Sequence, residues 1–201
     1  MTKLDNLIRF MEGKSGIATS KQLLNAGFSA GLVDAATKKG VIDRETRGIY
    51  VLPDRVLDEF AALSLRWRRC VFSHGSALYL HGLSDRMPTR FDVTVPRPYN
   101  TSNLKAENPT LRIHRAEGEV LELGLTSLCS PSGIEIPVYD VERCICDMLK
   151  LREKGTVDMQ LFNTAITGYF KQKNKDIPKL EKYAQKLGVD DDLHRYTEVL
   201  L

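Results

Sequence analysis

Apolar residues at helical spacing open the chain and predict three short helices in its first 40 residues. Residues 3–12 repeat their apolar side chains at the spacing of one amphipathic helix. Residues 19–27 form a second helix, because Thr19 is followed three residues later by a glutamine, as in a capping box. Residues 29–40 form a third, with Ser29 as its N-cap. The outward face of this third helix carries small or polar side chains.

Two short apolar runs then predict a β-hairpin with charged residues between its strands. The runs cover residues 41–42 and 49–52, and Pro53 ends the second because proline cannot donate to a strand ladder. Three helices followed by a hairpin predict a winged helix-turn-helix over residues 1–53. A domain of this size has no cavity for chemistry, but a helix beside a charged wing suits the major groove of DNA.

In the middle of the chain the spacing of apolar residues changes from the helical pattern to the alternation expected of strands. Residues 54–72 are expected to form a connecting helix that ends in a basic run, and residues 74–81 a short helix stopped by Gly82. Alternating or strand-like segments follow at residues 91–96, 111–115, 119–128 and 134–140, with a proline- and asparagine-rich loop between the first two.

Aspartates mark the starts of four C-terminal helices. Asp140, Asp158, Asp176 and Asp190 each precede a helical pattern, and the last pattern runs to the C-terminus. The predicted fold class is therefore α+β. An N-terminal winged helix-turn-helix is followed, over residues 73–201, by a small mixed sheet and a helical cluster.

Composition is that of an ordinary globular chain. The 201 residues are 42% hydrophobic and 27% charged, and the length favours two domains. No apolar run approaches the ~20 residues of a membrane helix, and the amphipathic N-terminus does not resemble a signal peptide. We expect a cytoplasmic protein with no membrane contact. Its cysteines are expected to be free thiols: Cys70, Cys129, Cys144 and Cys146.

Charge is distributed unevenly along the chain. Residues 1–55 carry 9 Lys and Arg against 6 Asp and Glu, and residues 66–115 carry 9 against 3. Residues 116–201 carry 11 against 15, a net of −4. A polyanion would therefore be attracted to the first 115 residues, and the acidic remainder is better interpreted as scaffold or partner surface.

The third helix and the wing hold most of the candidate DNA contacts. Lys38, Lys39, Arg44 and Arg47 are expected to hold phosphates, which gives affinity without sequence information. Asp34 either accepts from a cytosine amine or pairs with Lys38 at i+4, and the ion pair is favoured. The predicted DNA-binding residues are Ser29, Gly31, Asp34, Ala35, Lys38, Lys39, Arg44, Arg47, Arg66, Arg68 and Arg69.

The basic run at residues 66–69 admits two other interpretations. Trp67 between arginines could form a stacking platform for RNA or a single strand. A lone tryptophan in a linker helix more commonly packs its ring, and the arginines beside it could follow DNA phosphates next to the wing.

No catalytic or metal site is predicted. His74 and His81 lie seven residues apart, which does not match the i, i+4 spacing of a zinc pair, and are expected to be structural. Cys144 and Cys146 point to different sides of a helix. A Mg²⁺-dependent nuclease using Asp92 and a glutamate at position 135 is the best enzymatic alternative, but the second carboxylate lacks a nearby lysine. The chain is interpreted as non-catalytic, without a cofactor.

Three segments carry a family resemblance. The wing sequence RGIYVLP, the stretch SHGSALYLHGLSDRMPTRFDVTVPRPYN and the segment IPVYDVERCICDML occur in this order. Together they resemble the AbiE-type abortive-infection antitoxins, and the resemblance spans essentially the whole chain. The middle stretch is its most specific part.

The resemblance implies a function in phage defence. It implies an antitoxin of a type IV toxin–antitoxin system that binds inverted repeats in its own promoter and represses its operon. The implied partner is a nucleotidyltransferase-like toxin, opposed without a stable complex. Direct contact with the toxin through the acidic C-terminal helices is the alternative mechanism.

Overall fold

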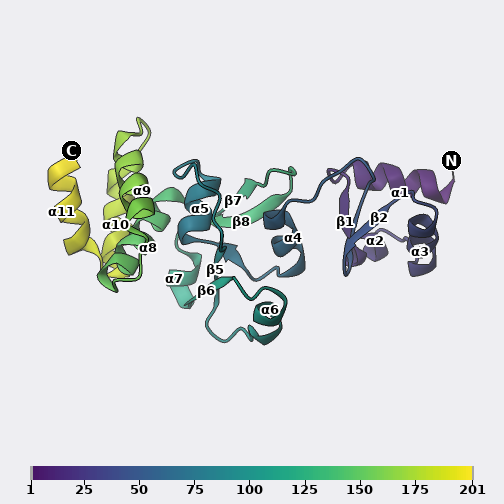
Figure 1. The fold of residues 1–201 in the computed structure, drawn as a ribbon, viewed down its shortest axis with the longest axis horizontal. Coiled ribbons are helices and arrows are strands. Elements are labelled where there is room, and N and C mark those ends of the chain that lie inside the picture. Colours follow the sequence, from purple (N-terminus) through teal and green to yellow (C-terminus); the bar gives the residue numbers. More distant parts are fainter. Residues whose placement is uncertain (1, 201) are drawn as a thin grey trace. The chain divides into compact units, whose positions relative to one another are not determined.

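The computed structural model describes residues 2–200 and divides into two compact units (Figure 1). The first unit consists of residues up to Arg68 together with residues 129–136. The second consists of residues 69–128 and 137 onwards. Met1 and Leu201, where the predicted domains begin and end, lie outside the described residues.

Helices and a three-stranded antiparallel sheet make up the first unit. The sheet order is β1-β3-β2, so the middle strand is the last of the three in sequence. The elements are α1 (Lys3–Glu12), β1 (Ile17–Thr19), α2 (Ser20–Asn25), α3 (Ala30–Lys38), β2 (Asp43–Thr46), β3 (Ile49–Val51) and α4 (Glu59–Arg66).

Local capping begins the first three helices where the sequence predicts. Thr19 caps α2, and its hydroxyl and backbone amide exchange hydrogen bonds with Gln22, as a capping box requires. Ser29 accepts from the backbone N–H of Leu32 at the start of α3. The core that these helices cover includes the fully buried Leu7, Leu23, Ala36 and Ile42.

A five-stranded mixed sheet and seven helices form the rest of the described chain. The sheet order is β6-β5-β4-β8-β7; β5 pairs parallel with β6 and antiparallel with β4, which pairs parallel with β8. The strands are β4 (Val71–Phe72), β5 (Asp92–Pro96), β6 (Arg112–Ala116), β7 (Leu125–Cys129) and β8 (Glu135–Tyr139). The helices are α5 (His74–Leu80), α6 (Ser102–Glu107), α7 (Gly118–Glu122), α8 (Val141–Glu153), α9 (Met159–Lys171), α10 (Ile177–Leu187) and α11 (Asp190–Leu200).

Helix α8 is the centre of the second unit. α5, α9, α10 and α11 all pack against it, and Figure 1 shows the last three gathered around it. Every residue from position 142 to position 149 is buried, which is the pattern of a helix enclosed on all sides. Asp140, Asp158 and Asp176 cap α8, α9 and α10, as predicted. The two sheets and the C-terminal group of helices confirm the predicted α+β class.

The wing differs from the sequence prediction in its first strand. Residues 41–42 are not a strand; β2 is the charged run that follows, and each of its residues is exposed. Ile42 instead lies in the core beside α1 and α2. The apolar side chain of Ile42 thus marks a core position and not a strand. Strand β2 lies at the edge of this small sheet, and its side chains are all exposed.

The predicted connecting helix over residues 54–72 is also too long. Its helical part is α4 alone, and the next apolar pair, Val71 and Phe72, is strand β4 in the middle of the second sheet. Both residues are buried. A pair of apolar residues fits a helix or a strand equally well, and only the neighbouring strands decide between them.

Two further segments were assigned wrongly. The run at residues 119–128 was predicted to be one strand, but it begins with α7 and only its second half is a strand, β7. The loop between β5 and β6 contains a helix, α6, which was not predicted. Both helices have fewer than seven residues, so their periodicity is too short to be detected in sequence.

Candidate functional sites: an exposed helix face and a basic pocket

Helix α3 presents one exposed face and one buried face. Val33 and Ala36 are buried, as predicted. The residues predicted to contact DNA are all exposed: Ser29, Gly31, Asp34, Ala35, Lys38 and Lys39. A Cβ atom built on Gly31 would meet nothing within 4 Å, so the N-terminal end of this face is open.

Asp34 and Lys38 form the ion pair that the sequence favours. Their side chains approach to 2.8 Å between Lys38 Nζ and Asp34 Oδ2, and both side chains are largely exposed. The hydrogen bond to Asp34 and its negative charge raise the pKa of Lys38. Lys39 lies beside this ion pair and is exposed as well.

The wing residues Arg44 and Arg47 are exposed as well. Arg44 lies in β2 opposite Tyr50 of β3, and the register shifts between Arg44 and Thr46. Arg47 lies in the turn between the two strands, where Gly48 adopts a φ of +82°. The edge of this sheet thus carries two arginines in a segment whose side chains are free of the core.

The basic run at residues 66–69 is divided between the two units. Arg66 lies in the last turn of α4, with its guanidinium 5.4 Å from the centre of the Trp67 ring. Arg68 closes the first unit and Arg69 opens the second, and both are exposed. The half-buried Trp67 is held against its own helix end, consistent with a packing role for this ring.

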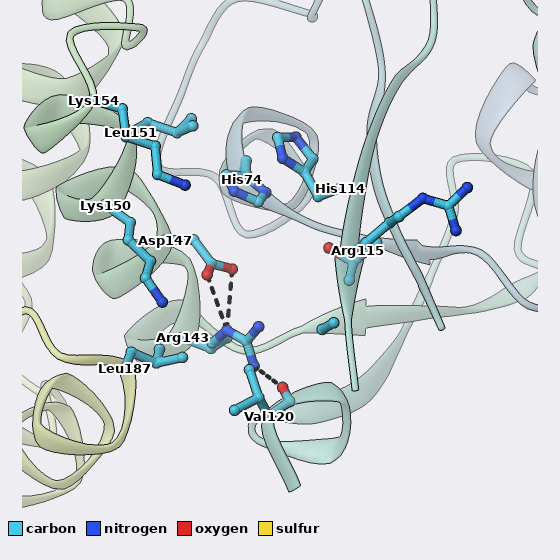
Figure 2. A pocket seen from close by; sticks show the side chains of 12 residues that line it. His74, His114, Arg115, Val120, Arg143, Asp147, Lys150, Leu151, Lys154 and Leu187 are labelled. Carbon is cyan, nitrogen blue, oxygen red and sulfur yellow. Dashed lines mark hydrogen bonds and ion pairs between the residues drawn. The ribbon is translucent and has the colours of Figure 1, made fainter. Parts of the chain in front are cut away.

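A second candidate site lies entirely within the second unit. It is a cavity of about 210 Å³ (Figure 2) between β5, β6, α5, α7, α8 and α10. Its lining residues are His74, Thr94, His114, Arg115, Ala116, Val120, Arg143, Asp147, Lys150, Leu151, Lys154 and Leu187.

Two stacked histidines form one wall of this cavity. The rings of His74 and His114 lie 3.6 Å apart between centroids and 16° from parallel. His114 Nε2 donates to Asp92 Oδ1 at 2.9 Å, and Arg112 approaches the same carboxylate oxygen at 3.9 Å. The sequence did not reveal His114, because the parallel pairing of β5 with β6 is what places it opposite Thr94.

A buried ion pair forms the opposite side of the cavity. Arg143 Nε donates to both oxygens of Asp147, at 3.1 Å each, and its Nη1 donates to the carbonyls of Val120 and Leu123. Burial raises the pKa of Asp147, and the adjacent guanidinium opposes that shift. The pair neutralises its own charges and fastens α7 to α8, as Figure 2 shows.

His81 and the cysteine pair of α8 form contacts with backbone carbonyls. His81 Nε2 donates to the carbonyl of Tyr139 at 2.8 Å. Cys144 Sγ and Cys146 Sγ lie near different carbonyls, those of Tyr139 and Leu180. All four cysteines are free, and only Cys129 is exposed.

Asp92, the candidate Mg²⁺ ligand, is buried and engaged by His114, whereas Glu135 is exposed. Within residues 2–200 no three or more His, Cys, Asp or Glu side chains gather as a metal site would require.

None of the helices in this part of the chain is long and apolar enough to span a membrane.

The N-terminal residues match a known family. Residues 6–53, which run from α1 to the end of the wing, match the family described as "Transcriptional regulator, AbiEi antitoxin". Over these residues the chain is similar to the AbiEi antitoxins. The resemblance predicted from the sequence is confirmed there, and this AbiEi-like region contains α3 and both wing strands. The family is one of antitoxin transcriptional regulators, not of enzymes.

Comparison with complete proteins adds little to this match. No curated protein matches the sequence. The crystal structure of the RV2827C protein from Mycobacterium tuberculosis is similar over 100% of this chain and 81% of that chain, with 11% identity and a TM-score of 0.47. A likeness at this level carries no argument about function.

Proposed function

We propose that this protein is the antitoxin of a type IV toxin–antitoxin system and represses its own operon. In this proposal, residues 1–53 act as a winged helix-turn-helix that binds inverted repeats in the promoter. The AbiEi-like region supports this assignment, because the matching family consists of transcriptional regulators. A connecting segment that contains α4 leads from this reader to the second unit, which would act as the antitoxin domain of a cytoplasmic protein of phage defence.

The exposed face of α3 is the observation that carries the proposal. Gly31 and Ala35 present almost no side chain, which allows the backbone of the helix to approach base edges closely. The major groove of B-DNA is wide enough to admit one α-helix, and recognition helices contact bases near their N-terminal ends. Ser29 and Gly31 occupy that end of α3.

Basic residues around this face would hold the DNA backbone. Lys38 and Lys39 end α3, and Arg44 and Arg47 extend from the wing, so phosphates on two sides of a groove can be neutralised. Asp34 and Lys38 form an ion pair with no net charge, so the net positive charge of this surface comes from Lys39, Arg44 and Arg47. Arg66, Arg68 and Arg69 would supply additional phosphate contacts.

The second part of the proposal concerns the toxin. The family implies a nucleotidyltransferase-like toxin as functional partner, opposed without a stable complex. Three of the acidic residues that could bind it directly have a local role: Asp192 pairs with Arg195 at 3.1 Å, and Asp190 to Asp192 lie in the first turn of α11, where acids stabilise the helix.

A titration on the protein's own promoter tests DNA binding at two levels. Arg44→Ala with Arg47→Ala should weaken binding to every sequence, and each lost phosphate contact should flatten the log–log salt slope by about one unit. Lys3→Ala with Arg9→Ala removes the same charge from exposed positions of α1 and is the matched control. Gly31→Glu should weaken specific binding at least tenfold, whereas Gly31→Ala should preserve it.

The outcomes separate binding from folding. Position 31 is open, so both substitutions should leave the unfolding temperature of the N-terminal unit unchanged or raised, because alanine and glutamate favour helix over glycine. An unchanged salt slope in the arginine variant would remove the wing from the interface. Full operator affinity in Gly31→Glu would remove α3 and contradict the proposed recognition mode.

A further inference from the structure

The cavity in the second unit has the features of a built anion site. Nothing in the proposed DNA-binding function uses the residues that line it. We propose that this cavity binds the phosphate group of a small ligand, held by His74, His114, Lys150 and Lys154. This inference is independent of the proposed operator binding, since the site lies outside the AbiEi-like region.

His74 offers a hydrogen-bond donor to the cavity. Thr94 Oγ1 donates to Ser73 Oγ at 3.0 Å, which leaves the Ser73 hydroxyl proton for Nδ1 of His74, also at 3.0 Å. An accepting Nδ1 places the ring proton on Nε2. The hydrogen bond to Ser73 uses Nδ1, so Nε2 is the ring nitrogen that His74, 7% exposed, can offer to a ligand in the cavity that it lines.

The backbone of His74 is also unusual. Its φ is +48°, a left-handed conformation that is strained for a residue with a side chain and that clusters at functional sites. Burial and the neighbouring His114 lower the pKa of His74 to about 3, so the ring is neutral at physiological pH. A neutral ring with its proton on Nε2 donates one hydrogen bond without requiring a charged group in the interior.

His114 is oriented for the same ligand. Its Nε2 donates to the Asp92 carboxylate, so Nδ1 is the nitrogen left for a ligand, and as an acceptor it can receive a hydrogen bond from a P–OH group. Stacking on His74 fixes the plane of the ring.

Two lysines supply the positive charge. Lys150 lies in the last turn of α8 and Lys154, four residues later, is the C-cap of that helix, so their like charges repel, and neither forms an ion pair with a described residue. The other cations of the cavity are already engaged. Arg143 is paired with Asp147, and Arg115 Nη1 donates to the carbonyls of Arg97 and Tyr99. An anion between the two ammonium groups would relieve their repulsion.

The size of the cavity limits the ligand. At about 210 Å³ it falls below the ~300–1,000 Å³ of pockets that enclose whole organic ligands. A phosphate ion or the phosphate group of a small monoester fits this volume and its donors, since lysine ammonium groups bind phosphate as point charges. Free phosphate and a phosphomonoester share the chemistry, and the experiment distinguishes them.

Calorimetric titration of the full chain tests the site. Inorganic phosphate, glycerol 3-phosphate and adenosine monophosphate are titrated at constant ionic strength, with sodium chloride as the blank. We expect phosphate or the small monoester to bind with a Kd of about 1 mM or tighter. Lys150→Ala with Lys154→Ala should weaken binding at least tenfold, and Lys171→Ala with Lys173→Ala, at exposed positions away from the cavity, should not.

Nitrogen-15 spectra of the histidine rings give a second measurement. Phosphate should shift His74 Nε2 and His114 Nδ1 but leave His81, which is bonded to Tyr139, unchanged. His74→Asn retains a residue that tolerates left-handed backbone and should bind more weakly. A tighter small monoester identifies an organic phosphate as the source, and equal affinities identify free phosphate. Absence of binding, equal weakening in the control pair, or unchanged histidine signals would overturn the proposal.

Discussion

Gly124 adopts a left-handed backbone, with a φ of +75°, between α7 and β7. A Cβ atom there would lie 2.7 Å from the Arg143 Cβ and 2.8 Å from Asp140 Oδ1, closer than side chains pack. The Gly124 carbonyl also accepts from the backbone N–H of Asp140, the N-cap of α8. A single hydrogen in place of a side chain therefore lets the chain pass against the start of the central helix.

Gly124→Ala should destabilise the second unit by about 2–4 kcal/mol, the sum of a left-handed alanine and an overpacked contact. Gly155→Ala is the matched control, because Gly155 has a similar φ of +65° but nothing within 4 Å of an added Cβ. The control should cost about 1 kcal/mol. Urea denaturation measures the free energy of unfolding of both variants. Equal decreases in this free energy would show that the close contact at Gly124 does not contribute to the cost of the substitution.

At the scale of elements, α10 is fastened to α8 by one cation. Lys179 Nζ lies 2.9 Å from Asp140 Oδ2 and 2.9 Å from Glu142 Oε2, both at the first turn of α8. Burial opposes the charge of this ammonium group, but hydrogen bonds to the two carboxylates outweigh it and raise the pKa of Lys179. Tyr169 Oη completes the arrangement by donating to Glu142 Oε1.

Lys179→Ala should cost about 1–2 kcal/mol, less than a fully buried pair because the lysine side chain is 35% exposed. Lys182→Ala, an exposed lysine on the same helix, should stay within about 0.5 kcal/mol of the parent. Because the folded pKa is raised, the contribution of Lys179 is fully present below the usual lysine pKa of ~10.4, declines as the pH rises above that value, and is lost once the pH passes the raised folded pKa. Thermal unfolding is measured at pH 7 and pH 11. The difference in unfolding temperature between the parent protein and the Lys179 variant should be smaller at pH 11.

At the scale of the whole molecule, the chain returns to its first unit between β7 and β8. Ser132 donates through its backbone N–H to Asp58 Oδ2 at 2.8 Å, and its hydroxyl reaches the same oxygen. Asp58 is the N-cap of α4, so the returning segment also supports that helix. Ile134 packs against Ile17, Ile49 and Val51, which belong to β1 and β3.

This return predicts a local coupling that hydrogen exchange can detect. Ile134→Ala removes a half-buried side chain from this cluster and should cost the first unit about 1–2 kcal/mol. Amides of β1 and β3 should then exchange roughly tenfold faster, with those of α8 unchanged. Ile113→Ala makes the same truncation at a half-buried position of β6 and should leave β1 and β3 unchanged. Unaltered exchange in β1 and β3 of the Ile134 variant would show that the segment contributes no stability there.

The sequence by itself determined the features that depend on neighbours three or four residues apart. The Thr19 capping box, the aspartate caps of α8 to α10 and the Asp34–Lys38 ion pair all occur as predicted. Each is complete within one turn of helix, so no distant residue is needed to specify it.

Only the tertiary structure decided which strands pair and which side chains meet. Val71 and Phe72 became a central strand because β5 and β8 lie on either side of them. His114 lies forty residues after His74 in the sequence. The two rings stack because β6, which carries His114, pairs parallel with β5. Residues 129–136 joined the first unit through contacts with residues more than seventy positions earlier. Such pairings depend on contacts that close long loops, and the local pattern of the sequence carries no information about them.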